Sequence, residues 1–173
     1  IKLCENYYKQ YDCNYYSVMP TNLYGPNDNF NLETSHVLPA MIHKMHAAMQ
    51  SNNHTVVLWG TGIPKREFLY VEDLADAIFF LMNKVEAKDL YDQGLTHINI
   101  GTGEDLSIAE LADTIKNVVG FKGEIKYDST KPDGTPRKLM DVTRLHNLGW
   151  KHKTSLEEGI KKTYKWFLDN YKK

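Results

Sequence analysis

Short β-rich segments alternate with longer amphipathic segments along this chain, and this alternation constrains the fold more than any other feature. Clusters of β-branched, aromatic and other apolar residues predict strands over residues 15–19, 55–59, 66–70, 97–100 and 124–127. Apolar residues that recur every three or four positions predict helices over residues 1–11, 37–49, 71–83, 107–119, 141–148 and 155–171. Strands that alternate with helices in this way indicate an α/β fold.

Apolar stripes on the predicted helices indicate which residues face the core. The helix over 107–119 has the clearest start, because Ser107 and Glu110 have the spacing of a capping box. Its stripe is Ile108, Leu111, Ile115 and Val118, and the stripe of residues 155–171 is Leu156, Ile160, Tyr164 and Phe167. The other expected stripes are Val37, Met41, Met45 and Met49 in residues 37–49, and Leu74, Ala75, Ile78, Leu81 and Met82 in residues 71–83.

The composition is that of an ordinary globular domain and argues against several classes of partner. Of the 173 residues, 42% are hydrophobic and 25% charged, and 21 Lys and Arg residues against 22 Asp and Glu residues leave a net charge of -1. Without a basic excess or a long apolar run, neither nucleic acid nor a membrane is an expected partner. Cys4 and Cys13 have neither disulfide-framework nor zinc-site spacing, so we expect free thiols and a reduced, cytoplasmic setting.

Residues 20–64 are dense in Gly, Pro and Asn, and a ligand-facing surface is expected there. Residues 21–31, and further along the chain residues 131–138, are predicted loops. His36 stands at the start of a predicted helix, whose N-terminus disfavours the charged imidazolium. That setting suits proton exchange near neutral pH, with a surface or capping role as the alternative. Trp59, beside Gly60, either stacks on a ring at a pocket edge or fills the core.

Several cations and two further histidines are weaker candidates on the residues alone. Guanidinium groups chelate phosphate oxygens in pairs, but ordinary surface charge explains each of these cations equally well: Lys44, Arg66, Arg137 and Lys138. His43 and His46 could share a metal, yet no carboxylate is well placed beside them, so we expect a solvated helix face and no metal site. The turn 101–103 (GTG) lacks the third glycine of a nucleotide-binding fingerprint and predicts only a tight turn.

Five segments, taken in order, resemble a known family. They are SVMPTNLYGPNDNF (17–30), SHVLPA (35–40), WGTGIPKREFLYVEDLA (59–75), HINIGTG (97–103) and KPDGTPRKLMDVTRLHNLGW (131–150). Together they resemble the GDP-L-fucose synthases, which are extended short-chain dehydrogenase/reductases. The resemblance implies the C-terminal part of an extended Rossmann-type fold. Residues 1–35 would end the dinucleotide-binding domain, and residues 36–173 would be mainly the smaller substrate-binding subdomain, with some elements returning to the Rossmann sheet.

The resemblance also implies an activity and a set of roles. The activity is NADPH-dependent 3,5-epimerisation and 4-reduction of GDP-4-keto-6-deoxy-D-mannose, and His36 would be the catalytic proton donor. The residues facing NADP(H) would be Pro20, Asn22, Leu23 and His36. The residues holding the GDP-sugar would be Lys44, Trp59, Arg66, Asp133 and Lys138.

Other parts of the family's site fall outside the matched segments. The catalytic Y-x-x-x-K motif would precede the segment matched by residues 1–11, whose helix begins without a capping residue, as in a chain cut from a longer one. The acid–base partner of His36 would be a cysteine of the amino-terminal half, a role that neither Cys4 nor Cys13 inherits. We therefore expect no activity from these 173 residues alone, and a homodimer only for the full-length protein.

Two alternatives stay open. The first keeps the fold but changes the substrate to a UDP- or dTDP-sugar, which the loop KPDGTPRK disfavours. The second is a non-catalytic module that binds a nucleotide-sugar, for which a histidine at position 36 would be unnecessary.

Overall fold

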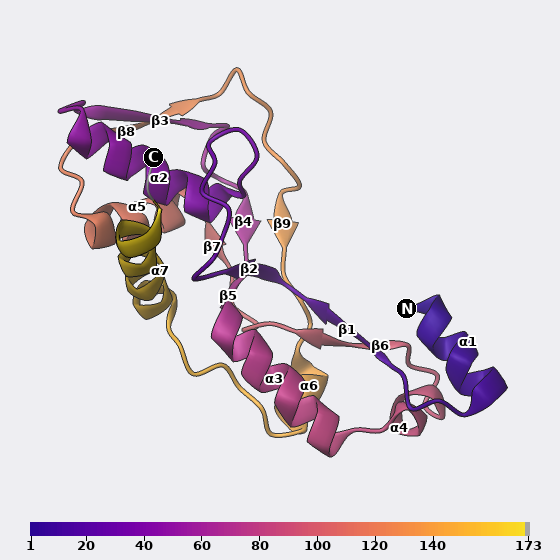
Figure 1. The fold of residues 1–173 in the computed structure, drawn as a ribbon. Helices are drawn as coiled ribbons and strands as arrows, with labels where there is room; N and C mark the ends of the chain where they lie inside the picture. Colours follow the sequence, from indigo (N-terminus) through magenta and orange to yellow (C-terminus); the bar gives the residue numbers. More distant parts are fainter. Residues whose placement is uncertain (172–173) are drawn as a thin grey trace.

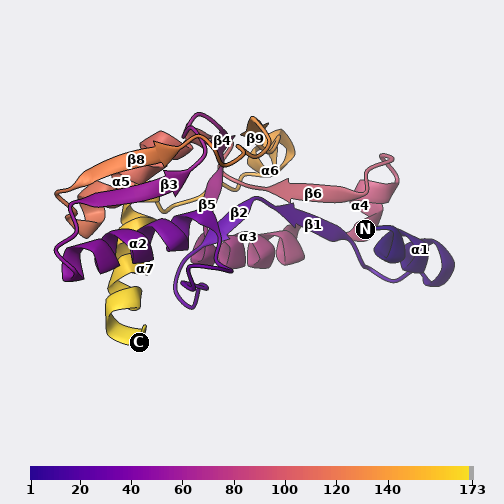
Figure 2. The ribbon, with the colours of Figure 1, turned by 90° about the horizontal axis from the view of Figure 1, so that it is seen from above.

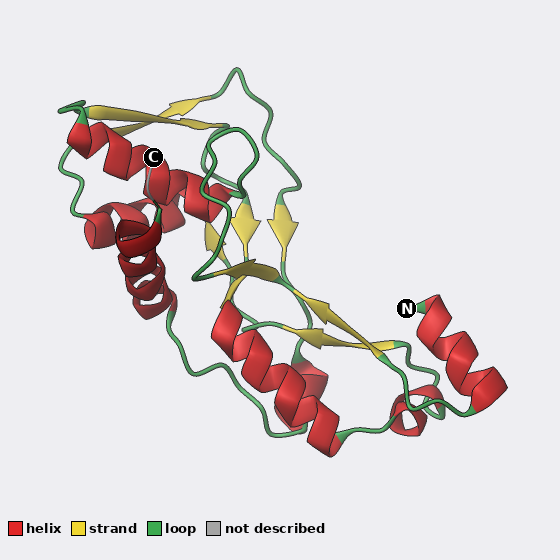
Figure 3. Ribbon diagram, viewed as in Figure 1, coloured by secondary structure: helices red, strands yellow, loops and turns green. Residues whose placement is uncertain are grey.

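A computed structural model describes residues 1–171 and confirms the α/β class, because helices alternate with strands whose main pairings are parallel (Figures 1 and 3). The first half contains α1 (Lys2–Tyr11), β1 (Ser17–Pro20), β2 (Asn22–Tyr24), α2 (Val37–Gln50), β3 (Thr55–Trp59), β4 (Lys65–Arg66), β5 (Phe68–Tyr70) and α3 (Val71–Lys84). The second half contains α4 (Ala87–Tyr91), β6 (His97–Ile100), β7 (Leu106–Ser107), α5 (Ile108–Val119), β8 (Glu124–Asp128), β9 (Arg137–Lys138), α6 (Thr143–Asn147) and α7 (Leu156–Asn170).

The strands join segments that are far apart in the sequence. The parallel pairs are β1 with β6, β2 with β5, and β3 with β8. The short strand β4 lies between β7, to which it is antiparallel, and β9, to which it is parallel. Because parallel neighbours require a long crossover, each pair has at least one helix in its connection. The three-stranded sheet ties the middle of the chain to the loop that precedes α6.

Two hydrophobic clusters lie apart, one at the end of the molecule that contains α2, α5 and α7, and the other toward the middle (Figures 1 and 2). One packs α2, α5 and α7 together beside β3 and β8, and its fully buried members include Met45, Leu111 and Ile160. The other packs α3 and α6 against β6 around Leu81 and Ile98. Burial of this apolar area is the main contribution to the stability of each cluster. The polar turns between the two clusters carry the candidate site.

The predicted helix faces are confirmed for α5 and α7 but only in part for α3, where Leu81 is buried and Leu74 packs against the core. Ser107 and Glu110 form both halves of the capping box. In α3 the buried residues are Asp73, Ala77 and Leu81, while three of the five expected positions are exposed, namely Ala75, Ile78 and Met82. The Asp73 carboxylate accepts hydrogen bonds from the main-chain N–H groups of Lys153 (3.4 Å) and Thr154 (3.0 Å). These bonds hold the Asp73 side of the helix toward the interior. A prediction based on the spacing of apolar residues could not include them.

The stripe predicted for α2 is correct only in its middle. Met41 and Met45 are buried, whereas Val37 and Met49, near the helix ends, are exposed. The solvated face predicted around His43 is wrong, because His43 is 7% exposed and its Nδ1 lies 2.7 Å from the carbonyl oxygen of Phe30. A buried imidazole needs such a partner, and here the loop that precedes α2 supplies it.

Other differences concern short elements. The predicted loop over 21–31 begins with β2, the predicted loop over 131–138 ends in β9, the predicted strand over 66–70 is divided at Glu67, and α4 was not predicted. Two of these strands have two residues each, too few for a period to be read. Both cysteines are free thiols, as predicted. Among the described residues, no helix has the length and apolarity that crossing a bilayer requires.

Candidate functional site

Three of the four residues expected to face a cofactor, Pro20, Asn22 and Leu23, lie where parallel strands end. β1 and β6 end at Pro20 and Ile100, and the N–H of Thr21 donates to the Ile100 carbonyl at 3.0 Å. Ligands of open α/β sheets bind at such carboxyl ends. Asn22 is exposed there, and its Nδ2 donates to the main-chain carbonyl of Glu67 at 2.7 Å, while Pro20 and Leu23 are half-buried. This hydrogen bond and the pairing of β2 with β5 hold the segment beside the β4–β5 junction.

His36 is the N-cap of α2 and presents an exposed side chain. The loop before it is ordered by its own side chains, since Asn31 Oδ1 accepts from the N–H groups of Glu33 (2.9 Å) and Thr34 (3.2 Å). Burial raises the pKa of the Asp28 carboxyl, and the Asn29 N–H and the charge of His36 oppose that shift. The imidazole therefore stands at a helix N-terminus, on a structured loop and within electrostatic reach of a partly buried carboxyl.

Trp59, at the end of β3, lies at the surface rather than in the core. Its side chain is 71% exposed, which decides between the two readings of this residue. The Nζ atoms of Lys44 and Lys131 lie 5.8 Å and 5.6 Å from the centre of its ring. Sequence reasoning assigned no role to Lys131. Two cations against one exposed indole make a surface suited to a ligand that has both an aromatic ring and negative charge.

The pairing of β4 with β9 sorts the remaining cations between two faces. Arg66 is paired with Lys138 and Lys65 with Arg137, and paired residues of a sheet point to the same face. On the Lys65 face, Arg137 forms an ion pair with Asp105, whose side chain is only 7% exposed. Arg66 and Lys138 share the other face. The structure thus separates Arg137, which is paired with Asp105, from Arg66 and Lys138 on the opposite face.

Asp133 binds within the chain. Its Oδ1 accepts from the Thr61 N–H at 2.9 Å and its Oδ2 from the Thr61 hydroxyl at 2.6 Å, and these bonds lower the pKa of the Asp133 carboxyl. Gly60, at φ +83°, lies so close that a Cβ there would overlap the Asp133 carboxylate. Asp133 therefore anchors residues 131–138 on the turn after β3, and any contact with a ligand would use its remaining lone pairs.

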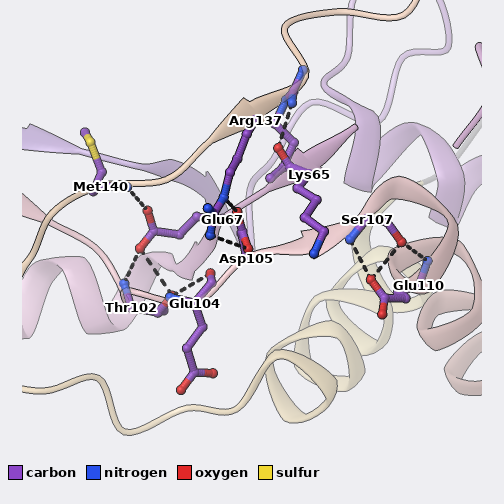
Figure 4. Close-up of polar contacts among 10 residues, drawn as sticks. Lys65, Glu67, Thr102, Glu104, Asp105, Ser107, Glu110, Arg137 and Met140 are labelled. Carbon is purple, nitrogen blue, oxygen red and sulfur yellow. Dashed lines mark hydrogen bonds and ion pairs between the residues drawn. The ribbon is translucent and has the colours of Figure 1, made fainter. Parts of the chain in front are cut away.

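Glu67 is the residue of this region that sequence reasoning missed. It lies between β4 and β5, has no exposed surface, and hydrogen-bonds to segments from two other parts of the chain (Figure 4). The sequence did contain one indication of such a role, because Glu67 lies directly before the apolar residues Phe68, Leu69 and Tyr70 of a predicted strand. A carboxylate in that position must either point to solvent or find hydrogen-bond donors in the interior. Nothing in the sequence indicates which.

The five expected substrate residues fall into two groups joined by the loop 131–138. Lys44 and Trp59 form one group together with Lys131, which was not expected, and Arg66, Asp133 and Lys138 lie on the segments that form the other. We call Lys44, Trp59, Arg66, Lys131 and Lys138 the cation face. Across residues 1–171, no cluster of three His, Cys, Asp or Glu side chains is arranged to hold a metal ion.

The spacing Y-x-x-x-K occurs in this chain at Tyr127 and Lys131, but not in a helix. β8 ends at Asp128, so the two side chains are not carried on one helix turn. The Tyr127 ring lies beneath Gly62, and Lys131 lies over Trp59. This pair therefore lacks the shared helical turn of a catalytic tyrosine–lysine pair.

Known proteins match the chain over nearly its whole length. It is 55% identical over 172 residues to the GDP-L-fucose synthase of Escherichia coli (strain K12) and 53% identical over 170 residues to the probable GDP-L-fucose synthase 1 of Oryza sativa subsp. japonica. Each match covers 98% of this chain but 54% and 50% of those proteins, so the chain spans about half the length of the curated relatives it matches. Among solved structures, a GDP-L-fucose synthetase from Naegleria fowleri bound to NADP is similar at a TM-score of 0.87 and 35% identity, covering 98% of this chain and 53% of that one.

The family of this chain is shown by a match that extends over more than half of its length, not by a single motif. Residues 1–101 match the NAD dependent epimerase/dehydratase family, which is more than half of the chain. The matched part contains His36, Trp59 and Arg66 together with the strand ends around Asn22. The fold is an α/β fragment of an extended short-chain dehydrogenase/reductase. The chain therefore belongs to the NAD dependent epimerase/dehydratase family.

Proposed function

We propose that this chain carries the GDP-sugar-binding part of an enzyme that epimerises and reduces GDP-4-keto-6-deoxy-D-mannose to GDP-L-fucose with NADPH. The observation that carries the proposal is the cation face, in which the Nζ atoms of two lysines lie over the exposed ring of Trp59 and Arg66 is paired with Lys138 across β4 and β9. A diphosphate joined to a base and a sugar matches its charge and its aromatic surface. The names of the two GDP-L-fucose synthases that the chain resembles support the same class of ligand.

His36 has the setting that the epimerisation requires. Inverting a carbon beside a ketone needs one group that removes a proton and another that returns one on the opposite face. An exposed imidazole fixed by the start of α2 can act as one of these groups. By resemblance to the GDP-L-fucose synthases the other group is a cysteine, and the reduction takes its proton from a tyrosine. Both would come from the amino-terminal half that the relatives have.

The segment around Pro20, Asn22 and Leu23 has the position that a nicotinamide cofactor requires, at the carboxyl ends of two parallel strands. When bound, the cofactor supplies the hydride that reduces the ketone. In this proposal Asn22, held by Glu67, and the half-buried Leu23 line the nicotinamide side of that pocket, and His36 closes its substrate side. The NADP bound to the Naegleria protein supports NADP(H) as the cofactor.

The partners and setting follow from the same assignment. We propose a cytoplasmic protein that forms a homodimer when full length and that binds neither nucleic acid nor membrane. The net charge of -1 and the pairing of most lysines of α1 and α7 with carboxylates support the absence of an anionic polymer as partner.

The test joins residues 1–173 to the amino-terminal half of the Escherichia coli GDP-L-fucose synthase. We expect the joined protein to oxidise NADPH with GDP-4-keto-6-deoxy-D-mannose, and residues 1–173 alone to be inactive. His36→Asn should abolish epimerisation while the protein still binds the GDP-sugar. Inhibition by GDP, UDP and dTDP identifies the nucleotide, and stronger inhibition by UDP or dTDP would favour the first alternative above. An inactive joined protein that is folded and binds GDP-sugar would favour the non-catalytic alternative.

A further inference from the structure

Glu67 is a buried carboxylate whose interactions converge from several parts of the chain. It lies at the junction of β4 and β5, directly after Arg66, and none of its surface is exposed. A carboxylate buried in this way is strongly destabilising unless donors surround it. Its location, beneath the cation face and beside the strand ends, makes the identity of those donors informative.

One carboxylate oxygen binds the turn after β6. Oε1 accepts from the main-chain N–H of Thr102 at 2.6 Å, from that of Gly103 at 2.8 Å, and from the Thr102 hydroxyl at 3.3 Å (Figure 4). Successive N–H groups that point into one concavity are a general way to bind an anion. Gly101 approaches so closely that a Cβ there would overlap Oε1. The GTG turn thus binds the protein's own carboxylate, which explains its glycine without a nucleotide.

The other oxygen binds the loop that carries Lys138. Oε2 accepts from the main-chain N–H of Met140 at 2.9 Å, two residues after the end of β9. The main-chain carbonyl of Glu67 meanwhile accepts from Asn22 Nδ2 at 2.7 Å and from the Thr21 hydroxyl at 3.3 Å. The side chain of Glu67 therefore holds the substrate loop, and its carbonyl holds the segment on the cofactor side.

We propose that Glu67 is a positioning residue, which fixes Lys138 beside Arg66 so that the two cations meet the diphosphate of the GDP-sugar together. This inference rests on the proposed function. Glu67 itself touches neither ligand, because it is fully buried. The Glu67 side chain acts on the substrate loop, because it holds the Met140 N–H just after β9. Glu67 acts on the cofactor segment through its main-chain carbonyl, which every substitution at this position keeps.

Glu67→Gln separates these two effects. A carboxylate accepts from both sides, but an amide has one oxygen and one NH₂ group. Three donors converge on Oε1 and one on Oε2, so the amide oxygen should take the Oε1 position and the NH₂ should face the Met140 N–H. The substitution thus detaches the loop and keeps the turn. Losing a hydrogen bond to a charged group predicts a rise of about tenfold in the KM for the GDP-sugar, with the KM for NADPH unchanged.

The experiment compares three variants of the joined protein. Glu67→Gln should show this selective rise and faster hydrogen exchange at the Met140 amide, with Thr102 and Gly103 still protected. Glu104→Gln is the matched control, since Glu104 is exposed in the same turn and Figure 4 shows its carboxylate directed away from Glu67. It should leave both KM values unchanged. Glu67→Asp keeps the charge but is one methylene shorter, and should show the same selective effect at smaller size.

Three results would overturn the positioning role: equal losses for substrate and cofactor, protection of Met140 unchanged in Glu67→Gln, or the same shift in Glu104→Gln. If Glu67→Gln does not fold, the selective rise is required of Glu67→Asp, and its absence there refutes the proposal. Failure of the proposed function is distinguishable, because the unsubstituted joined protein would then lack activity. The exchange measurement needs no substrate and would still decide whether Glu67 holds the loop.

Discussion

The helical cluster of α2, α5 and α7 and the turns beneath the cation face are built by different physics. In the helical cluster, Met45, Leu111 and Ile160 are fully buried, and their contribution grows with the apolar area removed from water. Beneath the cation face, residues are fixed by directed bonds to Glu67 and Asp133. Apolar packing tolerates small changes in geometry, whereas directed hydrogen bonds determine where the bonded loops lie. Stability and positioning are therefore expected to respond to different substitutions.

The helical cluster should respond to loss of volume. Phe167 is 3% exposed and its ring centre lies 4.9 Å from that of Phe30 and 5.0 Å from that of Tyr171. Phe167→Ala should lower the free energy of unfolding by about 3–5 kcal/mol, measured by urea denaturation. Leu168→Ala, at the neighbouring 53% exposed position, is the control and should change it little. A similar loss in both variants would contradict the separation of the two regions.

The turn after β3 should be sensitive to an added side-chain atom rather than to a loss of buried apolar area. Gly60 and Gly120 both have positive φ, at +83° and +82°, but only Gly60 has a neighbour, Asp133, within reach of a Cβ. Each Gly→Ala substitution should cost about 1–2 kcal/mol for the left-handed backbone. Only Gly60→Ala should also displace residues 131–138.

Thermal unfolding and GDP-sugar affinity, measured on both variants, test this difference. We expect comparable backbone costs and a weaker affinity in Gly60→Ala alone. Equal affinities in the two variants would show that the Asp133 contact does not position the loop.

Substitutions in the cation face should weaken binding of the GDP-sugar without changing the stability of the fold. Trp59→Ala removes a 71% exposed ring, so the free energy of unfolding should change by less than about 0.5 kcal/mol. The KM for the GDP-sugar should rise by roughly tenfold, the loss expected for a ring contact with cation–π character. Val57→Ala, two residues earlier on β3 and 48% exposed, is a matched control that should leave the KM unchanged. Unfolding of Trp59→Ala at ordinary temperature would place Trp59 in the core after all.

The same contrast explains how much could be predicted from the sequence. The class, the long helices and the capping box of α5 were predictable, because period and propensity are local properties. The cations around Trp59 were found partly through resemblance, and their grouping depends on the pairing of β4 with β9. Asp73, His43 and Glu67 were misjudged or missed for one reason: each is a polar residue buried by donors or acceptors from distant segments. A local pattern contains no record of such partners.

The smallest expected effect concerns the ion pair on the opposite face of the β4–β9 pair. Hydrogen bonding to Arg137 lowers the pKa of the Asp105 carboxyl below its ordinary value of about 3.9. The folded state therefore binds this proton less readily than the unfolded chain. The stability contributed by the pair should be fully present above the ordinary value and lost as the pH falls through the lowered one. Asp105→Asn should reduce the melting temperature most at pH 7, and the difference from the unsubstituted protein should shrink as the pH falls below the ordinary value. A difference that does not shrink with falling pH would mean that Asp105 stabilises the loop by its shape rather than by its charge.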